Sequence, residues 1–294
     1  MSISRQNLSI VIVTFKSESV IHDCITSIGN DIDIIVVDNS NNLEFKEKLE
    51  KIYTNVSCLL SEKNLGMGAG NNIGIKNVKT DYVLILNPDV ILENSTINEL
   101  ILASQKIPNF AILAPISSNI DYPNYKFLED EKKINEKKSP FKVKSIDGFA
   151  MLFNKKRLDE IISKDYFDEN FFMYLENDDL CKRIRNVNED IFIVPTSKIK
   201  HLGGKAVDIK YKNGIELSRN WHWIWSKFYF NKKHFGYTKA FMLGFPKFLS
   251  SIIKYLFYSL TKNQIKKEIY KNRAGGFFNA AKNNSSWYRP NNNF

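Results

Sequence analysis

The sequence has little cysteine, and its cysteines follow no ligand or disulfide spacing. Cys24, Cys58 and Cys181 are far apart along the 294 residues. Structural zinc sites use closely spaced cysteines, and small secreted domains held by disulfides are dense in cysteine. We therefore expect buried free thiols in a reducing compartment, and we exclude a cysteine metal site.

Long apolar runs are also missing. A membrane-spanning helix needs about 20 predominantly apolar residues, and no window of that length is uninterrupted. The first residues, Met1–Asn7, lack the apolar segment of a signal peptide and lead directly into a strand pattern. The sequence therefore predicts a cytoplasmic protein.

Two common phosphate-binding motifs are absent. In Gly66-Met-Gly-Ala-Gly-Asn71 the third glycine of a dinucleotide fingerprint would fall on Asn71, and the segment follows the third expected strand instead of the first. No Gly-Lys-Ser/Thr follows it, which excludes a P-loop. If these glycines bind phosphate, they do so in another kind of site; the alternative is a helix start with small residues for close packing.

The chain is short of acidic charge, with a formal net charge of +10 at pH 7. Such a balance favours an anionic partner: nucleic acid, an acidic membrane surface or a phosphorylated substrate. Lysine is spread along the chain without a dense basic block, and no nucleic-acid-binding motif is present. We therefore expect no nucleic-acid partner.

What is present is a regular alternation of strand and helix patterns over the first 115 residues. Short β-branched runs alternate with segments that have apolar residues at helical spacing, which predicts βαβ units and a mostly parallel sheet. The expected strands are 8–14, 32–37, 56–60, 82–86 and 110–114, and the expected helices are 17–29, 43–52, a helix ending at 78, and one starting at Ser95.

Polar residues stand where ligands bind in such a sheet, at the C-terminal ends of strands. Thr14, Asp38 and Asp89 each follow an expected strand. Between the two carboxylates lies the glycine- and asparagine-rich turn 64–72, whose backbone N–H groups could approach phosphate. A carboxylate beside such a turn suits a nucleotide and a divalent cation.

Beyond residue 115 three further stretches stand out. Residues 119–145 are polar and predict a surface excursion, followed by a strand at 146–153 and a short helix at 155–163. The segment 167–185 combines aromatic residues with the acidic cluster Glu176, Asp178 and Asp179. After a strand at 191–194 comes His201-Leu-Gly-Gly204.

The last third is basic and aromatic. Apolar residues of 241–260 recur at helical spacing: Phe241, Phe245, Phe248, Leu249, Ile252, Ile253, Leu256 and Leu260. Two interpretations stay open, a helix packed on the catalytic core and a basic amphipathic helix lying in a membrane interface. We expect residues 1–215 to form the catalytic domain, and residues 216–294 to form a helical region for membrane or acceptor association.

The order of these motifs resembles glycosyltransferase family 2, with the GT-A fold, and most of all its rhamnosyltransferase-like branch. The matching segments are 9–14, 36–40, 64–74, 84–90, 147–153, 167–183 and 201–204, and Ser285–Pro290 resembles the C-terminal ending of that branch. The resemblance implies an α/β fold with a mixed sheet flanked by helices and a helical C-terminal extension.

The resemblance also implies roles for individual residues. Asp89 would hold Mg²⁺ or Mn²⁺, and His201 would complete the metal site. The catalytic carboxylates would be Glu176, Asp178 and Asp179, although the family's usual base aligns with Asn177, which cannot take a proton. The nucleotide-sugar pocket would be formed by Thr14, Asp38, Asn64, Gly66, Gly70, Asn72, Asn87, Asp147 and Gly148.

The implied activity is inverting transfer of a sugar from a dTDP- or UDP-sugar, with dTDP-rhamnose as the first candidate. The acceptor would be a glycan or lipid-linked glycan of surface polysaccharide synthesis, met by peripheral contact at the cytoplasmic face of a membrane. Two alternatives remain: transfer of another hexose or N-acetylhexosamine, and a catalytically silent scaffold that binds sugar nucleotides. Asn177, and Asn87 in place of a first metal-site aspartate, motivate the second alternative.

Overall fold

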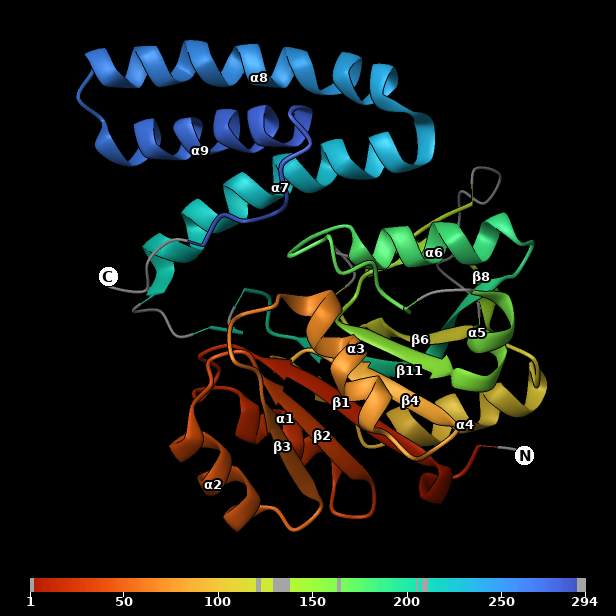
Figure 1. Ribbon diagram of the computed structural model, residues 1–294. Coiled ribbons are helices and arrows are strands. Elements are labelled where there is room, and N and C mark those ends of the chain that lie inside the picture. The colour runs from red at the N-terminus through yellow and green to blue at the C-terminus, as the bar shows by residue number, and fades with distance from the viewer. Residues whose placement is uncertain are drawn as a thin grey trace. The chain divides into compact units, whose positions relative to one another are not determined.

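The computed structural model describes residues 3–119, 123–128, 138–162, 165–204, 206–207 and 211–289 (Figure 1). The chain divides into two compact units. The first is formed by Met1–Asp168 and Asn177–Asp208, and the second by Glu169–Glu176 and Ile209–Phe294. A division of function between residues 1–215 and 216–294 stays a prediction.

A mixed nine-stranded sheet forms the centre of the first unit within the described residues, in the order β3-β2-β1-β4-β10-β6-β11-β5, with β8 also paired to β11. Strands β7 and β9 form a separate pair. The bounds are β1 Leu8–Thr14, β2 Asp33–Asp38, β3 Val56–Leu60, β4 Tyr82–Leu86, β5 Val90–Leu92, β6 Ile112–Ser117, β7 Tyr125–Lys126, β8 Phe141–Lys142, β9 Ser145–Ile146, β10 Ala150–Asn154 and β11 Ile191–His201.

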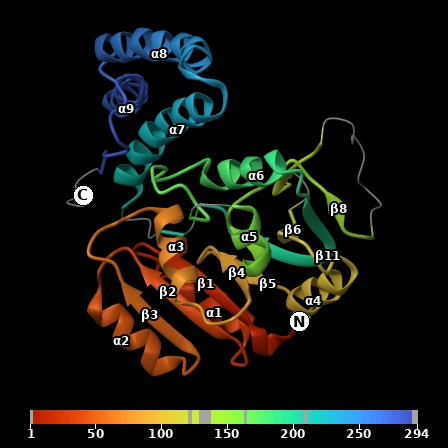
Figure 2. The ribbon, with the colours of Figure 1, turned by 45° about the vertical axis from the view of Figure 1, so that its right-hand side comes forward.

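Helices cover both faces of this sheet (Figures 1 and 2). Successive residues of a strand point to opposite faces, so Ile10 and Ile12 of β1 join one apolar core while Val11 joins the other. The first core includes α1 (Ile21–Ile28), α2 (Leu43–Ile52) and α4 (Thr96–Lys106). The second includes α3 (Met67–Asn77), α5 (Lys155–Ile161) and α6 (Glu176–Asn186), and a short 3₁₀ helix, Arg5–Asn7, precedes β1.

The expected strands and helices are present, and the sheet is mostly parallel as expected, with antiparallel strands added to it. Strands β1, β2, β3 and β4 are parallel, whereas β10 is antiparallel to β4 and β5 is antiparallel to β11. Only three residues separate β4 from β5, too few for the crossover that a parallel neighbour requires. The sheet therefore becomes mixed where the regular βαβ units end.

Three helices make up most of the second unit: α7 (Lys212–Phe235), α8 (Tyr237–Leu260) and α9 (Gln264–Ala281). Gly236, at φ 89°, separates α7 from α8 in a backbone conformation that favours glycine. The shared core contains Trp221, Trp225, Phe228, Ala240, Phe277 and Ala280. Helix α8 is mostly exposed: two residues of the predicted stripe, Phe248 and Ile252, are partly buried, and the other six are exposed, namely Phe241, Phe245, Leu249, Ile253, Leu256 and Leu260.

Candidate active site

One edge of the sheet gathers the polar residues that the sequence singled out. Strands β1, β2 and β4 are parallel and end there. Strand β10 begins there because it runs antiparallel to β4, with Ala150 opposite Leu86, and the Asn87 N–H donates to the Phe149 carbonyl at 2.9 Å. The structure therefore brings together the ends of strands far apart in sequence.

Thr14 and Asp38 lie side by side at the ends of β1 and β2, where they are register partners. The Thr14 hydroxyl donates to Asp38 Oδ1 at 3.0 Å, and the Asn42 backbone N–H donates to Asp38 Oδ2 at 3.0 Å. Asp38 is 1% exposed, so these bonds replace the water contacts that its carboxylate loses on burial. The pair therefore places hydrogen-bond acceptors in a fixed position at the C-terminal ends of β1 and β2.

Asn39, which is not among the site residues expected from the sequence, connects the glycine turn to this edge. Its Nδ2 donates to the Gly66 carbonyl at 3.1 Å, and its Oδ1 accepts from Ser61 Oγ at 2.8 Å and from the Leu65 N–H at 3.3 Å. Asn64 Oδ1 accepts from the Gly66 N–H at 3.0 Å. The only signal in the sequence was the position of Asn39 directly after Asp38.

The glycines of α3 act first through packing. A Cβ at Gly70 would lie 2.8 Å from Val13 Cγ1, and a Cβ at Gly74 would overlap Val11 Cγ1. The helix can therefore approach β1 only because these positions lack a side chain. Asn72 is fully buried and exchanges two hydrogen bonds with the Phe167 backbone, at 2.8 and 3.0 Å. Its position gives it a structural contact, and its part in a nucleotide pocket stays a prediction.

Asp89 and His201 lie side by side as two candidate metal ligands. Asp89 is 1% exposed, and its Oδ1 lies 3.4 Å from His201 Nε2. This approach is close enough for an ion pair if the imidazole is protonated, but no hydrogen bond reaches Oδ1. The His201 ring stacks on Phe149 with centroids 4.0 Å apart. The nearby Asn87 Oδ1 is also buried without a hydrogen bond.

One carboxylate and one imidazole fit a divalent cation whose other ligands are substrate phosphates and water. Mg²⁺ is commonly bound by one or two carboxylates plus substrate phosphates and water, and imidazole is a frequent metal ligand. Within the part of the chain that the structure describes, no three His, Cys, Asp or Glu side chains converge as a metal group. Asp89 and His201 would therefore hold the ion jointly with a bound diphosphate.

Asp147 belongs to a small charged cluster at the same edge. Burial raises the pKa of its carboxyl, and the nearby Asp178 charge raises it further, while Lys126 and His201 lower it. Lys126 Nζ donates to both oxygens of Asp178, at 2.7 and 2.9 Å. Lys126 comes from the polar excursion, where nothing in the sequence marked it.

Contacts of Asn177 and Asp179 fix helix α6, which carries the acidic cluster. Asn177 Nδ2 donates to the Ile146 carbonyl at 2.6 Å, and a Cβ at Gly148 would lie 3.2 Å from Asn177 Cβ. The side chain that takes the place of the family's base thus lies against Ile146–Gly148. Asp179 is fully buried and accepts from Arg183 Nε at 2.9 Å. This ion pair stabilises the helix, and a catalytic role for Asp179 stays a prediction.

Glu176 is assigned to the second unit and is partly buried. The two residues before it, Tyr174 and Leu175, adopt left-handed backbone at φ 71° and 68°. Non-glycine residues rarely take this conformation, and such strain clusters at functional sites. The strained backbone therefore agrees with the functional role that the sequence predicts for this segment.

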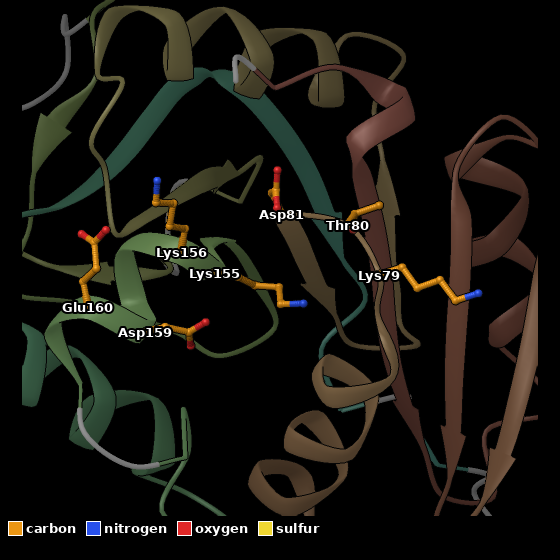
Figure 3. Close-up of a pocket in the computed structure, with 7 residues that line it drawn as sticks. All are labelled: Lys79, Thr80, Asp81, Lys155, Lys156, Asp159 and Glu160. Atoms are coloured by element: carbon orange, nitrogen blue, oxygen red, sulfur yellow. The ribbon is translucent and has the colours of Figure 1, made fainter.

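A shallow hollow of about 520 Å³ lies at the opposite end of β4 from Asp89 (Figure 3). Its lining combines three lysines with three acidic residues, so that opposite charges balance. The residues are Lys79, Thr80, Asp81, Lys155, Lys156, Asp159 and Glu160. We assign no function to this hollow.

Comparison with known proteins identifies the family of this chain. The family described as Glycosyl transferase family 2 matches residues 9–162. A low-salt glycan biosynthesis hexosyltransferase, Agl10 of Haloferax volcanii, is 28% identical over 210 residues, which cover 63% of this chain and 64% of the relative. Rhamnosyltransferase WbbL of Escherichia coli is 28% identical over 218 residues, which cover 65% of this chain and 82% of that protein.

A solved structure supports the fold. The crystal structure of GalNAc-T7 with UDP, GalNAc and Mn²⁺ superposes with a TM-score of 0.57 at 16% identity, covering 81% of this chain and 53% of that one. The likeness confirms the predicted GT-A fold, a mixed sheet flanked by helices. Because the family match extends over more than half of the chain, the protein belongs to glycosyltransferase family 2.

Proposed function

We propose that this protein is a metal-dependent, inverting glycosyltransferase that uses a nucleoside-diphosphate sugar. The names of the two relatives, a hexosyltransferase and a rhamnosyltransferase, support a hexose or deoxyhexose donor. We keep dTDP-rhamnose as the first candidate, ahead of UDP-linked hexoses and N-acetylhexosamines. The acceptor is a glycan or lipid-linked glycan of surface polysaccharide synthesis, met at the cytoplasmic face of a membrane.

The observation that carries the proposal is the buried Asp89 oxygen without a hydrogen bond, 3.4 Å from His201 Nε2 at the ligand-binding edge of the sheet. A buried carboxylate oxygen is costly unless a partner satisfies it. The bound ion would supply Lewis-acid neutralisation of the diphosphate leaving group. On the same edge, the pair of Thr14 and Asp38 offers acceptors for the hydroxyl and amide groups of a nucleoside.

A carboxylate must also accept the proton of the attacking acceptor hydroxyl. Asp178 is occupied by Lys126 and Asp179 by Arg183. Asp147 lies beside Gly148, which contacts Asn177, and its pKa is raised toward the range that suits a general base. We therefore add Asp147 to Glu176 and Asp178 as candidates for the base. A single displacement by the hydroxyl inverts the anomeric configuration.

Thermal stabilisation by ligands tests the donor site. A ligand that binds only the folded protein raises the melting temperature by mass action. UDP, dTDP and a panel of their sugar conjugates should be compared, each with and without Mn²⁺. We expect a shift with one nucleotide family that requires the metal. Equal shifts with and without Mn²⁺ would contradict the role of Asp89 and His201.

The silent scaffold remains the second candidate, and Asn177 motivates it. Both functions predict nucleotide binding, so the discriminating measurement is turnover of the donor identified above. Release of free nucleoside diphosphate in the presence of acceptor, lost in Glu176→Gln, Asp147→Asn or Asp178→Asn, would rule out the scaffold. Tight binding without any turnover would favour it.

A further inference from the structure

Helix α8 exposes a continuous apolar face. Met242, Leu249, Ile253, Leu256 and Leu260 recur at helical spacing, and their exposed fractions include 70% for Met242, 59% for Ile253 and 83% for Leu260. Among the described residues α8 is the one helix that is long and apolar enough to cross a membrane, and only 11% of its most apolar window is buried. Ile265, near the start of α9, is a further exposed apolar residue of this unit, at 75% exposure.

The positive charge of the chain is concentrated in the unit that carries this face. From Tyr211 to Arg289 the sequence has fifteen lysines and arginines but only two acidic residues, Glu216 and Glu268. The residues before Tyr211 carry a slight excess of acidic residues, so the second unit accounts for the basic character of the whole protein. Lys247 and Lys254 are both exposed and, being seven residues apart, lie on the same border of the apolar face.

We propose that α8 binds an anionic lipid surface by lying in the plane of the membrane, with the face of Met242, Leu249, Ile253 and Leu260 inserted among the acyl chains. Lys247 then contacts lipid headgroups from the border of that face. An amphipathic helix with lysines beside its apolar face is suited to this position. This inference rests on the proposed function. It identifies the surface with which the enzyme meets a lipid-linked acceptor.

The contacts of α8 decide between lying in the interface and spanning the bilayer. Helix α9 accompanies α8 along its length: Phe277 packs on Phe248 with ring centroids 4.9 Å apart, and Tyr270 stacks on Tyr258 at 5.6 Å. Lys254 and Lys266 lie over these two tyrosine rings. A spanning α8 would carry α9, with its four lysines and arginines, into the hydrocarbon, where charged side chains are costly.

Charge also argues against a second copy of the chain as the occupant of this face. Two copies meeting through α8 would bring two strongly basic units together, and like charges in contact oppose association. An anionic monolayer neutralises the same charges. The occupant that matches both the apolar face and its basic border is therefore lipid.

Vesicle flotation of the full-length protein tests the proposal. The test variant replaces Leu249, Ile253 and Leu260 by glutamine, which removes apolar surface without changing charge. The matched control replaces Leu43, Ile52 and Leu102, three similarly exposed apolar residues of the first unit, by glutamine. With phosphatidylcholine vesicles containing phosphatidylglycerol, the test variant should lower the partition coefficient by about a thousandfold or more, because three large side chains no longer enter the lipid. The control should bind like wild type.

Thiol labelling distinguishes the two membrane orientations. The native cysteines are all buried, so cysteines introduced by Thr238→Cys and Lys262→Cys, near the two ends of α8, should react selectively. On vesicles, an external membrane-impermeant maleimide should label both positions. Protection of one end would mean that α8 spans the bilayer and would overturn the in-plane arrangement.

Further outcomes would also contradict the proposal. Equal flotation of the test variant and wild type would show that another surface binds lipid. A wild-type dimer in sedimentation, converted to monomer by the three glutamines, would assign the face to a second copy. The nucleotide-induced thermal shift of the test variant should be measured in parallel. If the shift persists while flotation is lost, the lipid surface and the sugar-nucleotide site are separate. Failure of the lipid proposal and failure of the proposed function can then be recognised independently.

Discussion

At the residue scale, the carboxylates of the candidate site differ in what already binds them. Both oxygens of Asp38 accept hydrogen bonds, both oxygens of Asp178 accept from Lys126, and Asp179 is paired with Arg183. Asp89 keeps one oxygen without a hydrogen bond, and Asp147 has a raised pKa caused first by burial. Of these five carboxylates, Asp89 and Asp147 are therefore the two left for metal and proton chemistry, and Glu176 stays a further candidate for the base.

The raised pKa of Asp147 makes its removal stabilising. A carboxyl whose pKa is higher in the folded state contributes stability below its unfolded pKa, near 3.8, and loses that contribution as the pH rises through the folded value. Asp147→Asn should therefore unfold at a higher urea concentration than wild type at pH 7, measured in EDTA, and the difference should shrink toward pH 3.8. If Asp147 is the base, turnover should fall by about 10²- to 10⁴-fold. Equal stability of both proteins at pH 7 would contradict the burial argument.

Asp89→Ala should abolish metal-dependent nucleotide binding and leave the fold intact. The residue lies just beyond β4, and its Oδ1 accepts no hydrogen bond from the sheet. The matched control is Asp81→Ala, which changes an exposed aspartate directly before the same strand. The measurement is the thermal shift with dTDP or UDP in the presence of Mn²⁺. A normal shift in Asp89→Ala, or an equal loss in Asp81→Ala, would show that Asp89 is not the metal ligand.

At the scale of single elements, the sequence predicted whatever depends on local pattern. The bounds of β1, α2, β3 and β4 agree with the expected ranges, because buried β-branched runs and amphipathic spacing are local signals. Strand β5 and most of the length of β11 were missed. Three-residue β5 exists only through pairing with β11, and pairing between distant segments leaves no periodic trace in either of them.

For the candidate site too, the residues marked by a local pattern could be predicted, and those that depend on contacts between distant segments could not. Asp38 and Asp89 could be selected because each follows a strand. Lys126 could not, because its role depends on a chain excursion that returns to Asp178, 52 residues away. Residues 120–122 and 129–137 of the predicted excursion lie outside the described residues. Ser95 was correctly placed at the start of α4, but its side chain makes no capping hydrogen bond.

The close approach of α3 to β1 gives an element-scale prediction. Gly74→Ala should lower the free energy of unfolding by about 1–3 kcal/mol, because the added Cβ overlaps Val11 Cγ1 in a packed core. Gly275→Ala is the control: its Cβ would lie 3.4 Å from Trp221 Nε1, an ordinary contact, and alanine in a helix should stabilise by up to about 1 kcal/mol. Urea denaturation measures both. Adding Val11→Ala to Gly74→Ala should recover part of the loss, and strict additivity would contradict the contact.

At the scale of the whole molecule, the two units can be followed separately in solution. All four tryptophans, Trp221, Trp223, Trp225 and Trp287, belong to the second unit. Selective tryptophan excitation therefore reports the unfolding of that unit, whereas far-UV circular dichroism reports both units. A change that acts on one unit alone should separate the two signals.

His222 supplies such a change. Its ring is buried in the second unit, where Nε2–H donates to the Tyr288 carbonyl at 2.7 Å and Nδ1 accepts from Ser286 Oγ at 2.9 Å, a tautomer assigned from these partners. The Arg289 guanidinium lies beside the ring, with Nη1 3.5 Å from His222 Nε2, and it is also 3.2 Å from the centroid of Phe172, which packs on His222. Burial lowers the pKa of His222 from 6.5 to about 3, and the Arg289 charge lowers it further.

This shift predicts acid sensitivity of the second unit. A group whose pKa is depressed on folding contributes stability above its unfolded pKa and loses it as the pH falls toward the folded value. The unit should therefore lose stability between pH 6.5 and 3, by about 2 kcal/mol at pH 5. In urea titrations followed by tryptophan fluorescence, His222→Gln should be less stable than wild type at pH 7 but should show a flatter pH dependence between 6.5 and 5. His22→Gln, a histidine change on α1 of the first unit, should leave that dependence unchanged. A wild-type slope that survives in His222→Gln would assign the acid sensitivity to another group.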